Sequence, residues 1–530
     1  MLHTPRAMRG MVVAPHHLAA QAGLGVLREG GNAIEAMVAA ASAVAVVYPH
    51  MNALGGDNFW LIHDGSGAPI GIDACGAAAG AADAAFYRDR GHSEIPARGP
   101  TAANTVAGAV SGWHTALEVS ARWGGRLPLA RLLEDARTYA RDGVPVTRSQ
   151  HANTAAKRVE LIDVPGFAQT FLEDGNAPAV GAIFRHPALA DTLARLAEAG
   201  LDDFYRGELA RAMAAELQRL GSPLGADDLA RHRARTVAPL EVRLRAGTVY
   251  NLPPPTQGLA SLLMLALFER LDCTAPDGFD YVHGLVEAAK RAFAVRDAHV
   301  TDPAYMDRDP ESFLNEDALD AMAASIDRRE AAPWGAAQPA GGDTVWLGAI
   351  DGQGRAVSFI QSLYWEFGSG VVLRDTGVLW QNRGTSFSLD DGALNVLRPG
   401  RKPFHTIQPA MALPTDGRVV VYGTMGGEGQ PQTQAAVYTR HVVYGQALQA
   451  AVSAPRWLLG RTWGAAKTSL RIEDRFPKQV LASLAAAGHD VEVVGPFDEV
   501  MGHAGALARH RSGVIEGAAD PRGDGGVAAF

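Results

Sequence analysis

The stretch "GGDTVWLGAIDGQGRAVSF", residues 341–359, carries a clear local signal for a β-hairpin. Mostly apolar runs flank Asp-Gly-Gln-Gly at 351–354, which predicts two antiparallel strands beginning at Val345. A Pro-, Ala- and Gly-rich segment, residues 332–343, runs directly into Thr344 without a cap or turn of its own. By pattern alone, Thr344 opens an edge strand, because threonine favours strands.

The composition is that of a globular protein that can bury a large core. Of 530 residues, 47% are apolar and 20% charged. The net charge of −9 and the lack of a basic run argue against a nucleic-acid partner. Cys75 and Cys273 form no CxxC motif, which indicates two buried thiols and a reducing compartment.

The N-terminal residues do not have the pattern of a signal peptide. The longest apolar run, which starts at Ala36 and ends near Pro49, is too short to cross a bilayer and predicts a buried helix. We therefore expect a cytoplasmic protein without a membrane partner.

Periodicity predicts a helix-rich first part and a strand-rich second part. Helices are expected at 16–31 and 32–48, a hairpin at 58–75, and mostly helices from 113 to 300. Residues 303–342 lose their periodicity, which indicates a surface segment or a mobile linker. Strands are expected at 345–351, 356–363, 370–373, 377–384 and 418–425, followed by one long helix at 434–454.

Several standard catalytic motifs are absent from the sequence. It has no GxxxxGK[ST] phosphate loop, no HExxH helix and no GxSxG elbow. His16 and His17 form a polar pair at a helix start more readily than a metal site. We expect no metal and no cofactor.

The glycine-rich segment "YGTMGGEGQPQTQ", residues 422–434, predicts a strand, a tight turn and a helix that begins near Gln432. The N–H groups of Gly426 and Gly427 would lie near the helix N-terminus, where they could bind an anion or an oxyanion. By itself, the segment is better explained as a turn that merely requires glycine.

Five segments together resemble the gamma-glutamyltranspeptidase family of N-terminal nucleophile hydrolases. They lie in the family's order and span almost the whole chain: residues 26–62, 252–269, 287–303, 343–371 and 424–434. The resemblance implies an α+β fold, a four-layer αββα sandwich. It also implies a proenzyme that cleaves itself between Asp343 and Thr344.

In this family the two products, residues 1–343 and 344–530, form one intertwined domain. The resemblance implies a heterodimer and leaves open a dimer of heterodimers. Thr344 would then supply both a hydroxyl nucleophile and an α-amino base. Ser362 matches the family's second hydroxyl, and Gly426 and Gly427 match its oxyanion glycines.

The sequence departs from true transpeptidases where they bind glutamate. Cys75 stands where transpeptidases have an arginine for the α-carboxylate, and Tyr364 stands where they have an asparagine. Ser386 replaces the acidic residue that holds the amine, and Arg383 lies in the same stretch. His405 and Thr406 replace a Ser-Ser pair. These departures predict another small, anionic amide such as oxamate, with Arg383 and His405 supplying polar contacts. The replacements look more like the oxamate amidohydrolase and acylase branches of the family.

Other interpretations stay open at this point. Arg383 could equally be a structural residue that pairs with a nearby carboxylate such as Asp390. The enzyme could be a gamma-glutamyl hydrolase or transpeptidase, or an amidase resembling cephalosporin or glutaryl acylases. A protein of another class, an unprocessed and catalytically silent binding protein, is the remaining alternative.

Overall fold

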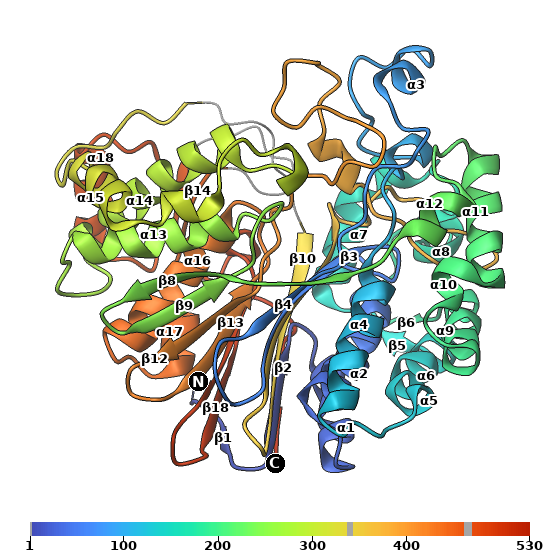
Figure 1. Ribbon diagram of the computed structural model, residues 1–530, viewed down its shortest axis with the longest axis horizontal. Helices are drawn as coiled ribbons and strands as arrows, with labels where there is room; N and C mark the ends of the chain where they lie inside the picture. The colour runs from blue at the N-terminus through green and yellow to red at the C-terminus, as the bar shows by residue number, and fades with distance from the viewer. Residues whose placement is uncertain (1–2, 336–342, 461–468) are drawn as a thin grey trace.

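The computed structural model describes residues 3–335, 343–460 and 469–530. Two β-sheets lie face to face, and helices cover the outer face of each (Figure 1). The chain therefore has the expected α+β architecture, a four-layer αββα sandwich. Apolar side chains fill three layers: one between the two sheets, and one between each sheet and its helices.

Each large sheet has seven strands. The first sheet has the order β19 (Gly526–Ala529), β2 (Gly10–Ala14), β10 (Asp343–Asp351), β11 (Ala356–Tyr364), β3 (Asp57–His63), β4 (Ile70–Asp73) and β7 (Arg235–Val237). The second has the order β1 (Arg6–Ala7), β18 (Ile515–Ala519), β17 (Ala504–Arg509), β13 (Val419–Thr424), β12 (Ala410–Pro414), β9 (Gly247–Asn251) and β8 (Leu240–Leu244). Strands from before and after Asp343 thus occur in both sheets.

The helices cover the two outer faces. On the first sheet lie α1 (His17–Arg28), α2 (Ala33–Val47) and α4 (Ala109–Arg122). Beyond them lie α5 (Leu129–Leu132), α6 (Glu134–Asp142), α7 (Arg148–Leu161), α8 (Phe167–Phe171), α9 (Pro187–Ala199), α10 (Asp203–Arg206), α11 (Glu208–Leu220) and α12 (Ala226–Arg231). The second sheet is covered by α13 (Gly258–Arg270), α14 (Phe279–His299), α16 (Gly429–Tyr438) and α17 (Leu448–Ser453), with α18 (Lys478–Ala486) packed on α14.

Helix α2 confirms the expectation of a buried helix after residue 32. Every one of its 15 residues is buried, as expected for a helix that is apolar on all sides. Asn32 and Glu35 form a capping box at its start. Within the described residues, no helix combines the length and apolarity needed to span a membrane.

The hairpin expected after Val345 is present as β10 and β11. Its register is irregular at its open end, since Val345 faces Gln361 whereas Asp343 faces Tyr364. Thr344 therefore lies opposite two residues of β11, Ser362 and Leu363. Such a bulge re-aims side chains and is common next to active sites.

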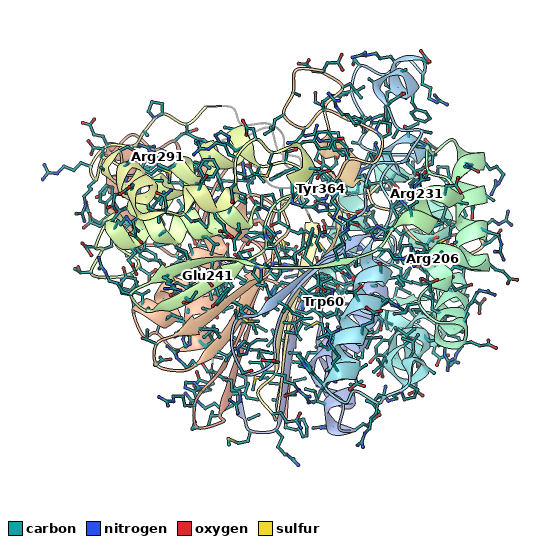
Figure 2. The ribbon with its side chains drawn as sticks, viewed as in Figure 1. Trp60, Arg206, Arg231, Glu241, Arg291 and Tyr364 are labelled. Atoms are coloured by element: carbon teal, nitrogen blue, oxygen red, sulfur yellow. The ribbon has the colours of Figure 1, made fainter. Side chains whose placement is uncertain are left out.

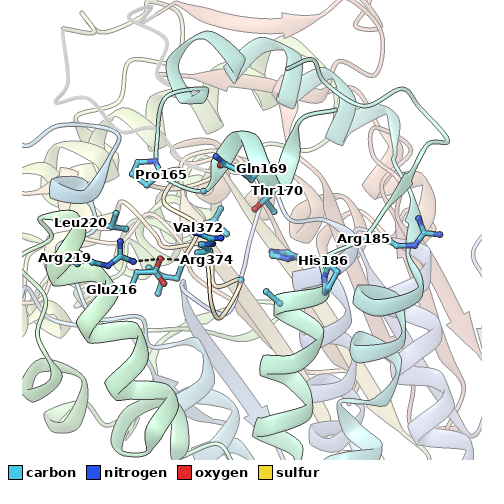
Figure 3. A pocket seen from close by; sticks show the side chains of 15 residues that line it. Pro165, Gln169, Thr170, Arg185, His186, Glu216, Arg219, Leu220, Val372 and Arg374 are labelled. Atoms are coloured by element: carbon cyan, nitrogen blue, oxygen red, sulfur yellow. Dashed lines mark hydrogen bonds and ion pairs between the residues drawn. The ribbon is translucent and has the colours of Figure 1, made fainter. Parts of the chain in front are cut away.

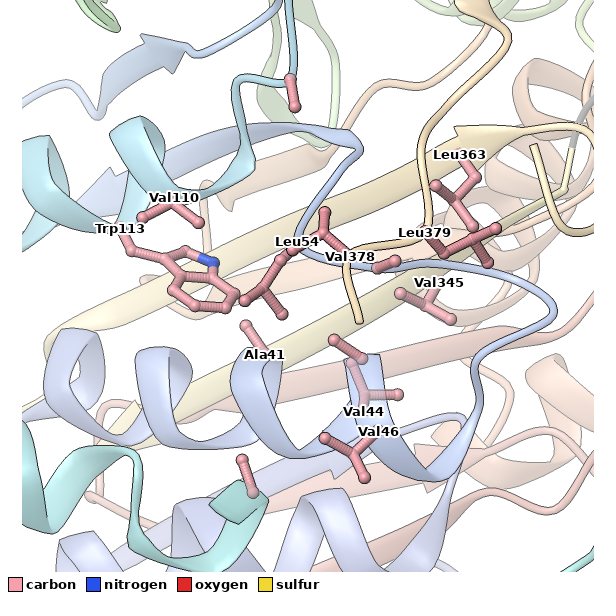
Figure 4. Packing of buried hydrophobic residues seen from close by; sticks show 14 of the residues in the cluster. Ala41, Val44, Val46, Leu54, Val110, Trp113, Val345, Leu363, Val378 and Leu379 are labelled. Carbon is pink, nitrogen blue, oxygen red and sulfur yellow. The ribbon is translucent and has the colours of Figure 1, made fainter. Parts of the chain in front are cut away.

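Side chains on the two faces of this hairpin have different surroundings. Val345 and Leu363 belong to the cluster under the helices and lie near Val44 of α2 (Figure 4). Trp346, one residue further along β10, belongs to the cluster between the two sheets. Because side chains alternate along a strand, Thr344 projects on the same side as Trp346, between the sheets.

Three expectations about elements are wrong. Residues 370–373 and 377–384 form no strands and are joined only by an isolated bridge, Val372 to Leu379. Gly370 and Gly377 have φ values of 76° and 66°, so the chain turns repeatedly here. The apolar residues of both segments are buried, but their backbones form no β-ladder.

The long helix expected at 434–454 is divided. Helix α16 ends at Tyr438, a π-helical turn spans Thr439–Val443, and α17 begins only at Leu448. Gly445 interrupts the helix with a φ of 69°.

The segment expected to be a surface segment or a mobile linker is mostly exposed and partly ordered. It contains α15 (Glu316–Ala324) and two 3₁₀ turns, Pro303–Tyr305 and Pro310–Phe313. Asp and Asn side chains cap these short elements, so order arises here without an apolar stripe. Residues 336–342 of the expected linker lie outside the described residues.

Candidate active site

Thr344 and Ser362 meet at the bulge of the β10–β11 hairpin. Thr344 is 1% exposed, and its Oγ1 donates a hydrogen bond to Ser362 Oγ at 3.2 Å. Ser362 Oγ also accepts a hydrogen bond from the backbone N–H of Tyr364 at 2.9 Å. The serine hydroxyl is therefore held in place beside the threonine hydroxyl.

Tyr364 and Arg383 form a stacked pair next to this bulge. Tyr364 has a φ of 83°, a strained conformation for a residue with a side chain. The Arg383 guanidinium carbon lies 3.7 Å from the centroid of the tyrosine ring. Figure 2 shows Tyr364 in the middle of the molecule, above the sheets, whereas Arg206, Arg231 and Arg291 lie at the outside.

Arg383 is a buried cation without a hydrogen-bonded partner at either Nη. It is 1% exposed, and neither Nη1 nor Nη2 has a hydrogen-bond partner. Burial lowers its pKa to about 10, although Tyr364, Asp57 and Cys75 act in the opposite direction. Asp390 is exposed and forms no ion pair with Arg383 in the described part of the chain. Asp390 is therefore not the partner of Arg383, and the nearby carboxyl that acts on Arg383 is that of Asp57.

The glycine-rich turn after β13 has the predicted strand-turn-helix form. Gly426 and Gly427 have φ values of 118° and 53°, which L-residues with side chains rarely adopt. The helix begins at Gly429, three residues earlier than expected. A Cβ at Gly423 would collide with Trp346, so this strand crosses β10 close to Thr344. The turn thus leaves β13 at the same end of the sandwich as Thr344.

Gln257 connects this turn to the segment that contains Thr406. Its Nε2 donates to the carbonyl oxygens of Thr406, at 2.5 Å, and Gly427, at 2.8 Å. Its Oε1 accepts from Arg296, which also donates to Glu428 Oε1 at 2.9 Å. Thr406 Oγ1 is buried without a partner. Sequence reasoning missed Gln257 and Arg296, although both lie in segments that carry the family resemblance.

His405 directly precedes Thr406 in the chain, and its carbonyl oxygen accepts from the N–H of Gln257 at 2.9 Å. It is fully buried, and neither ring nitrogen has a hydrogen-bond partner. Burial, together with Arg383 and Lys402, holds its pKa well below the ordinary value. Its Nε2 is 3.7 Å from Oδ2 of Asp57. Asp57 was not predicted from the sequence. It follows two glycines and begins a buried strand, and an acidic residue in that position could have indicated a functional site.

The remaining predicted residues contribute less to this group. Ser386 shares a 3₁₀ turn with Arg383, but its buried Oγ has no hydrogen-bond partner. Cys75 is a buried free thiol, and burial raises its pKa well above the ordinary value. The structure thus brings Thr344, Ser362, Tyr364 and Arg383 together by direct contacts, with His405 and Thr406 on an adjacent segment.

The described residues contain one group that could hold a metal ion, formed by His283, Glu287 and His489. A cation is already present there, because Lys290 donates to Glu287 Oε1 at 2.6 Å. His283 and His489 are hydrogen-bonded to each other at 2.8 Å. His16, in contrast, caps α1 by accepting from the N–H of Leu18, as expected for a helix-start residue.

A cavity of about 690 Å³ lies elsewhere, between α8, α9, α11 and residues 372–377 (Figure 3). Neither Thr344 nor Arg383 lines it. Its acidic side chain, Glu216, accepts from Arg219 at 3.3 Å and from the N–H of Arg374 at 3.0 Å. The carboxylate of Glu216 therefore has partners from the protein itself.

Comparisons with known proteins agree on one family. The gamma-glutamyltranspeptidase family model matches residues 19–530. The chain is 56% identical over 522 residues to the oxamate amidohydrolase proenzyme of Klebsiella pneumoniae, covering 98% of each chain. It is 44% identical over 519 residues to the glutathione hydrolase-like YwrD proenzyme of Bacillus subtilis, covering 97% of each. The cephalosporin acylase from Bacillus halodurans has a TM-score of 0.92 at 35% identity, covering 100% of this chain and 97% of the other. The chain therefore belongs to the gamma-glutamyltranspeptidase family and is an enzyme of that family.

Proposed function

We propose that this enzyme is a self-processing threonine amidohydrolase that acts on small anionic amides of the oxamate type. The observation that carries the proposal is Arg383, a buried guanidinium whose two Nη atoms have no hydrogen-bond partner. An unpaired buried cation is costly unless a ligand neutralises it. A carboxylate fits the planar guanidinium, which can donate two parallel hydrogen bonds to it.

Self-cleavage between Asp343 and Thr344 would generate the nucleophile. The new α-amino group has an ordinary pKa of about 7.7–8.0, so it can accept the proton of the Thr344 hydroxyl at neutral pH. Ser362 supports this role, since its Oγ lies 3.2 Å from Thr344 Oγ1 and is itself fixed by the Tyr364 N–H.

The reaction then proceeds through an acyl-enzyme. Thr344 Oγ attacks the amide carbon, and the negative charge that develops on the carbonyl oxygen is stabilised by the N–H groups of Gly426 and Gly427. The C–N bond breaks, and the nitrogen leaves as ammonia after taking the proton held by the α-amino group. Water then hydrolyses the ester, so oxamate yields oxalate and ammonia.

The substrate assignment is also supported by the sequence relatives. The relative at 56% identity is named as an oxamate amidohydrolase proenzyme. The positions that differ from true transpeptidases include Arg383, Ser386 and His405. A γ-glutamyl group would also require an acid for its amine, and Asp57 is the buried acid nearest to this role. Its raised pKa, about 7, makes it a weak counter-ion for an ammonium group.

The test combines processing with activity. Purified protein is run on a denaturing gel and assayed with oxamate, γ-glutamyl-p-nitroanilide and glutaryl amides. We expect two bands, split at residue 344, and ammonia release from oxamate. Thr344→Ala should give one full-length band and no activity. Thr236→Ala, in the exposed part of edge strand β7, should behave like wild type.

Two results would contradict the proposal. A persistent full-length band in active wild-type protein would exclude self-processing. Efficient γ-glutamyl transfer to a dipeptide, with no hydrolysis of oxamate, would exclude the substrate class. Preference for glutaryl amides would place the enzyme with the acylases instead.

A further inference from the structure

Asp57 lies on the same side of the first sheet as the proposed nucleophile. It opens β3, and its Cα is the register partner of Ser362 on β11. Directly opposite residues of antiparallel strands project their side chains to the same face. Thr344, Ser362 and Asp57 therefore form a row across three adjacent strands, between the two sheets.

One oxygen of the Asp57 carboxyl accepts two hydrogen bonds, and the other accepts none. Oδ1 accepts from the N–H groups of Gly76, at 3.0 Å, and Gly108, at 2.9 Å. Oδ2 is buried and has no hydrogen-bond partner. The carboxyl orientation is thus set by the backbone, which leaves Oδ2 for another group.

His405 faces this unused oxygen without bonding to it. Its Nε2 is 3.7 Å from Oδ2, beyond hydrogen-bond distance. The histidine is held by its backbone, which donates to Pro255 and accepts from Gln257, and its ring lies edge-on to Phe59. Two buried polar groups therefore face each other with their hydrogen-bonding capacity unfilled, which native interiors rarely tolerate without a ligand or water.

Burial, and not the charge next to it, favours the neutral form of Asp57. Burial raises its pKa to about 7, although the N–H groups of Gly76 and Gly108, the charge of Arg383 and the side chain of Gln381 oppose this. No hydrogen bond or ion pair joins Asp57 to Arg383 within the described ranges, so the two are not a closed salt bridge. The other titratable groups that face Asp57, His405 and their neighbours are Cys75, Tyr205, Asp73 and Lys402. Lys402 is bound to Asp73 at 2.5 Å.

We propose that Asp57 is a specificity-determining residue that faces the substrate as a neutral acid and donates a hydrogen bond from Oδ2 to its carboxylate, beside Arg383. This inference rests on the proposed function. A carboxylic acid kept neutral by its surroundings is an effective hydrogen-bond donor in an active site. With Asp57 neutral, the subsite keeps the full positive charge of Arg383. Ionisation of Asp57 cancels that charge and removes the donor.

The inference predicts how KM depends on pH. In wild type, KM for oxamate should rise by up to tenfold per pH unit above about pH 7, as the neutral acid disappears. KM for the uncharged analogue oxamide should stay nearly constant. The Thr344 amine also titrates in this range, but it affects turnover of both substrates alike and so can be separated.

The experiment measures KM and kcat of processed wild type, Asp57→Asn and Asp64→Asn between pH 5.5 and 9. Asparagine keeps an acceptor for Gly76 and Gly108 and a weaker, non-titrating donor. Asp57→Asn should raise KM for oxamate three- to tenfold at pH 6 and abolish the rise above pH 7. Asp64 is exposed in the turn between β3 and β4. Asp64→Asn should therefore keep the wild-type dependence of KM on pH.

Oxalate binding, measured by calorimetry at pH 6 and pH 8.5, tests the role of Asp57 separately from the proposed hydrolysis of oxamate. If oxamate is not hydrolysed but oxalate binding weakens at pH 8.5 in wild type and not in Asp57→Asn, the proposed function fails and the subsite stands. If oxamate is hydrolysed with a KM that is independent of pH, the subsite inference is wrong and the function stands. The wild-type comparison of oxamate with oxamide decides the matter even if Asp57→Asn does not fold.

Discussion

In the proposed function, Arg383 is the residue on which substrate choice depends most directly. Its guanidinium stacks on Tyr364 at 3.7 Å and leaves Nη1 and Nη2 without hydrogen-bond partners. Tyr364 has a φ of 83°, and residues with such strained backbones cluster at active sites. Local sequence could not distinguish this state from a structural ion pair, because the answer depends on which carboxylates the fold brings near.

Replacing Arg383 by glutamine should change specificity more than stability. A hydrogen bond to a charged group contributes about 1.5–3 kcal/mol. We therefore expect kcat/KM for oxamate to fall roughly ten- to hundredfold in Arg383→Gln, whereas kcat/KM for oxamide falls far less. Arg374→Gln, outside the site, serves as the control. Equal losses for the two substrates would show that Arg383 does not bind the anion.

At the scale of elements, the turn after β13 depends on partners distant in sequence. Gly426 and Gly427 adopt positive φ, and Gln257 at the start of α13 holds the Gly427 carbonyl. Arg296 of α14 in turn bonds both Gln257 and Glu428. Two helices that cover the second sheet thus position the turn that would stabilise the oxyanion.

Gln257→Leu should therefore reduce turnover rather than substrate binding. Loss of the two bonds from Nε2 frees the turn, and misplacing an oxyanion donor costs on the order of tenfold or more in kcat. We expect kcat to fall about 10- to 100-fold with KM changed less than threefold, measured on folded, processed protein. The control is Gln218→Leu on the exposed side of α11. A rise in KM with unchanged kcat would place Gln257 in substrate binding instead.

For the whole molecule, both sheets are built from strands on either side of Asp343. Strand β10, which begins at Asp343, lies between β2 and β11 in the centre of the first sheet. The division into residues 1–343 and 344–530 remains a prediction. Cleavage there would leave the pairing of β10 from Val345 onward unchanged, because the cut lies at the first residue of that strand.

Buried neutral histidines should make the enzyme unstable in acid. Burial lowers the pKa of His16, His50 and His232 to about 3 and that of His186 to about 4. The unfolded chain binds protons at these sites near pH 6.5, so stability is present above that pH and is lost as the pH falls. Below pH 6.5, each of these histidines lowers the free energy of unfolding by about 1.4 kcal/mol per pH unit. Asp57 acts in the opposite direction, because its pKa is raised to about 7. Between about pH 4 and 7 it increases the free energy of unfolding as the pH falls, with a slope similar to that of one histidine.

Thermal unfolding followed by circular dichroism between pH 7.5 and 5 checks this sign. The midpoint should fall steadily below pH 6.5. His50→Gln should flatten the profile, whereas His114→Gln should not, because His114 is half exposed. A midpoint that is constant or rises toward pH 5 would contradict the argument.

The sequence by itself, through short-range patterns and the family resemblance, predicted the layers of the fold and a candidate catalytic centre. The hairpin after Val345, the buried α2 and the glycine turn follow from short-range patterns, and the family resemblance located Thr344, Ser362 and the two glycines. Only the tertiary structure decided that Arg383 has no hydrogen-bonded partner at its Nη atoms and that Asp57 stands beside Ser362. The reason is physical: periodicity and turn chemistry act within about ten residues, whereas charge pairing and burial depend on segments about 300 residues apart, such as β3 and β11.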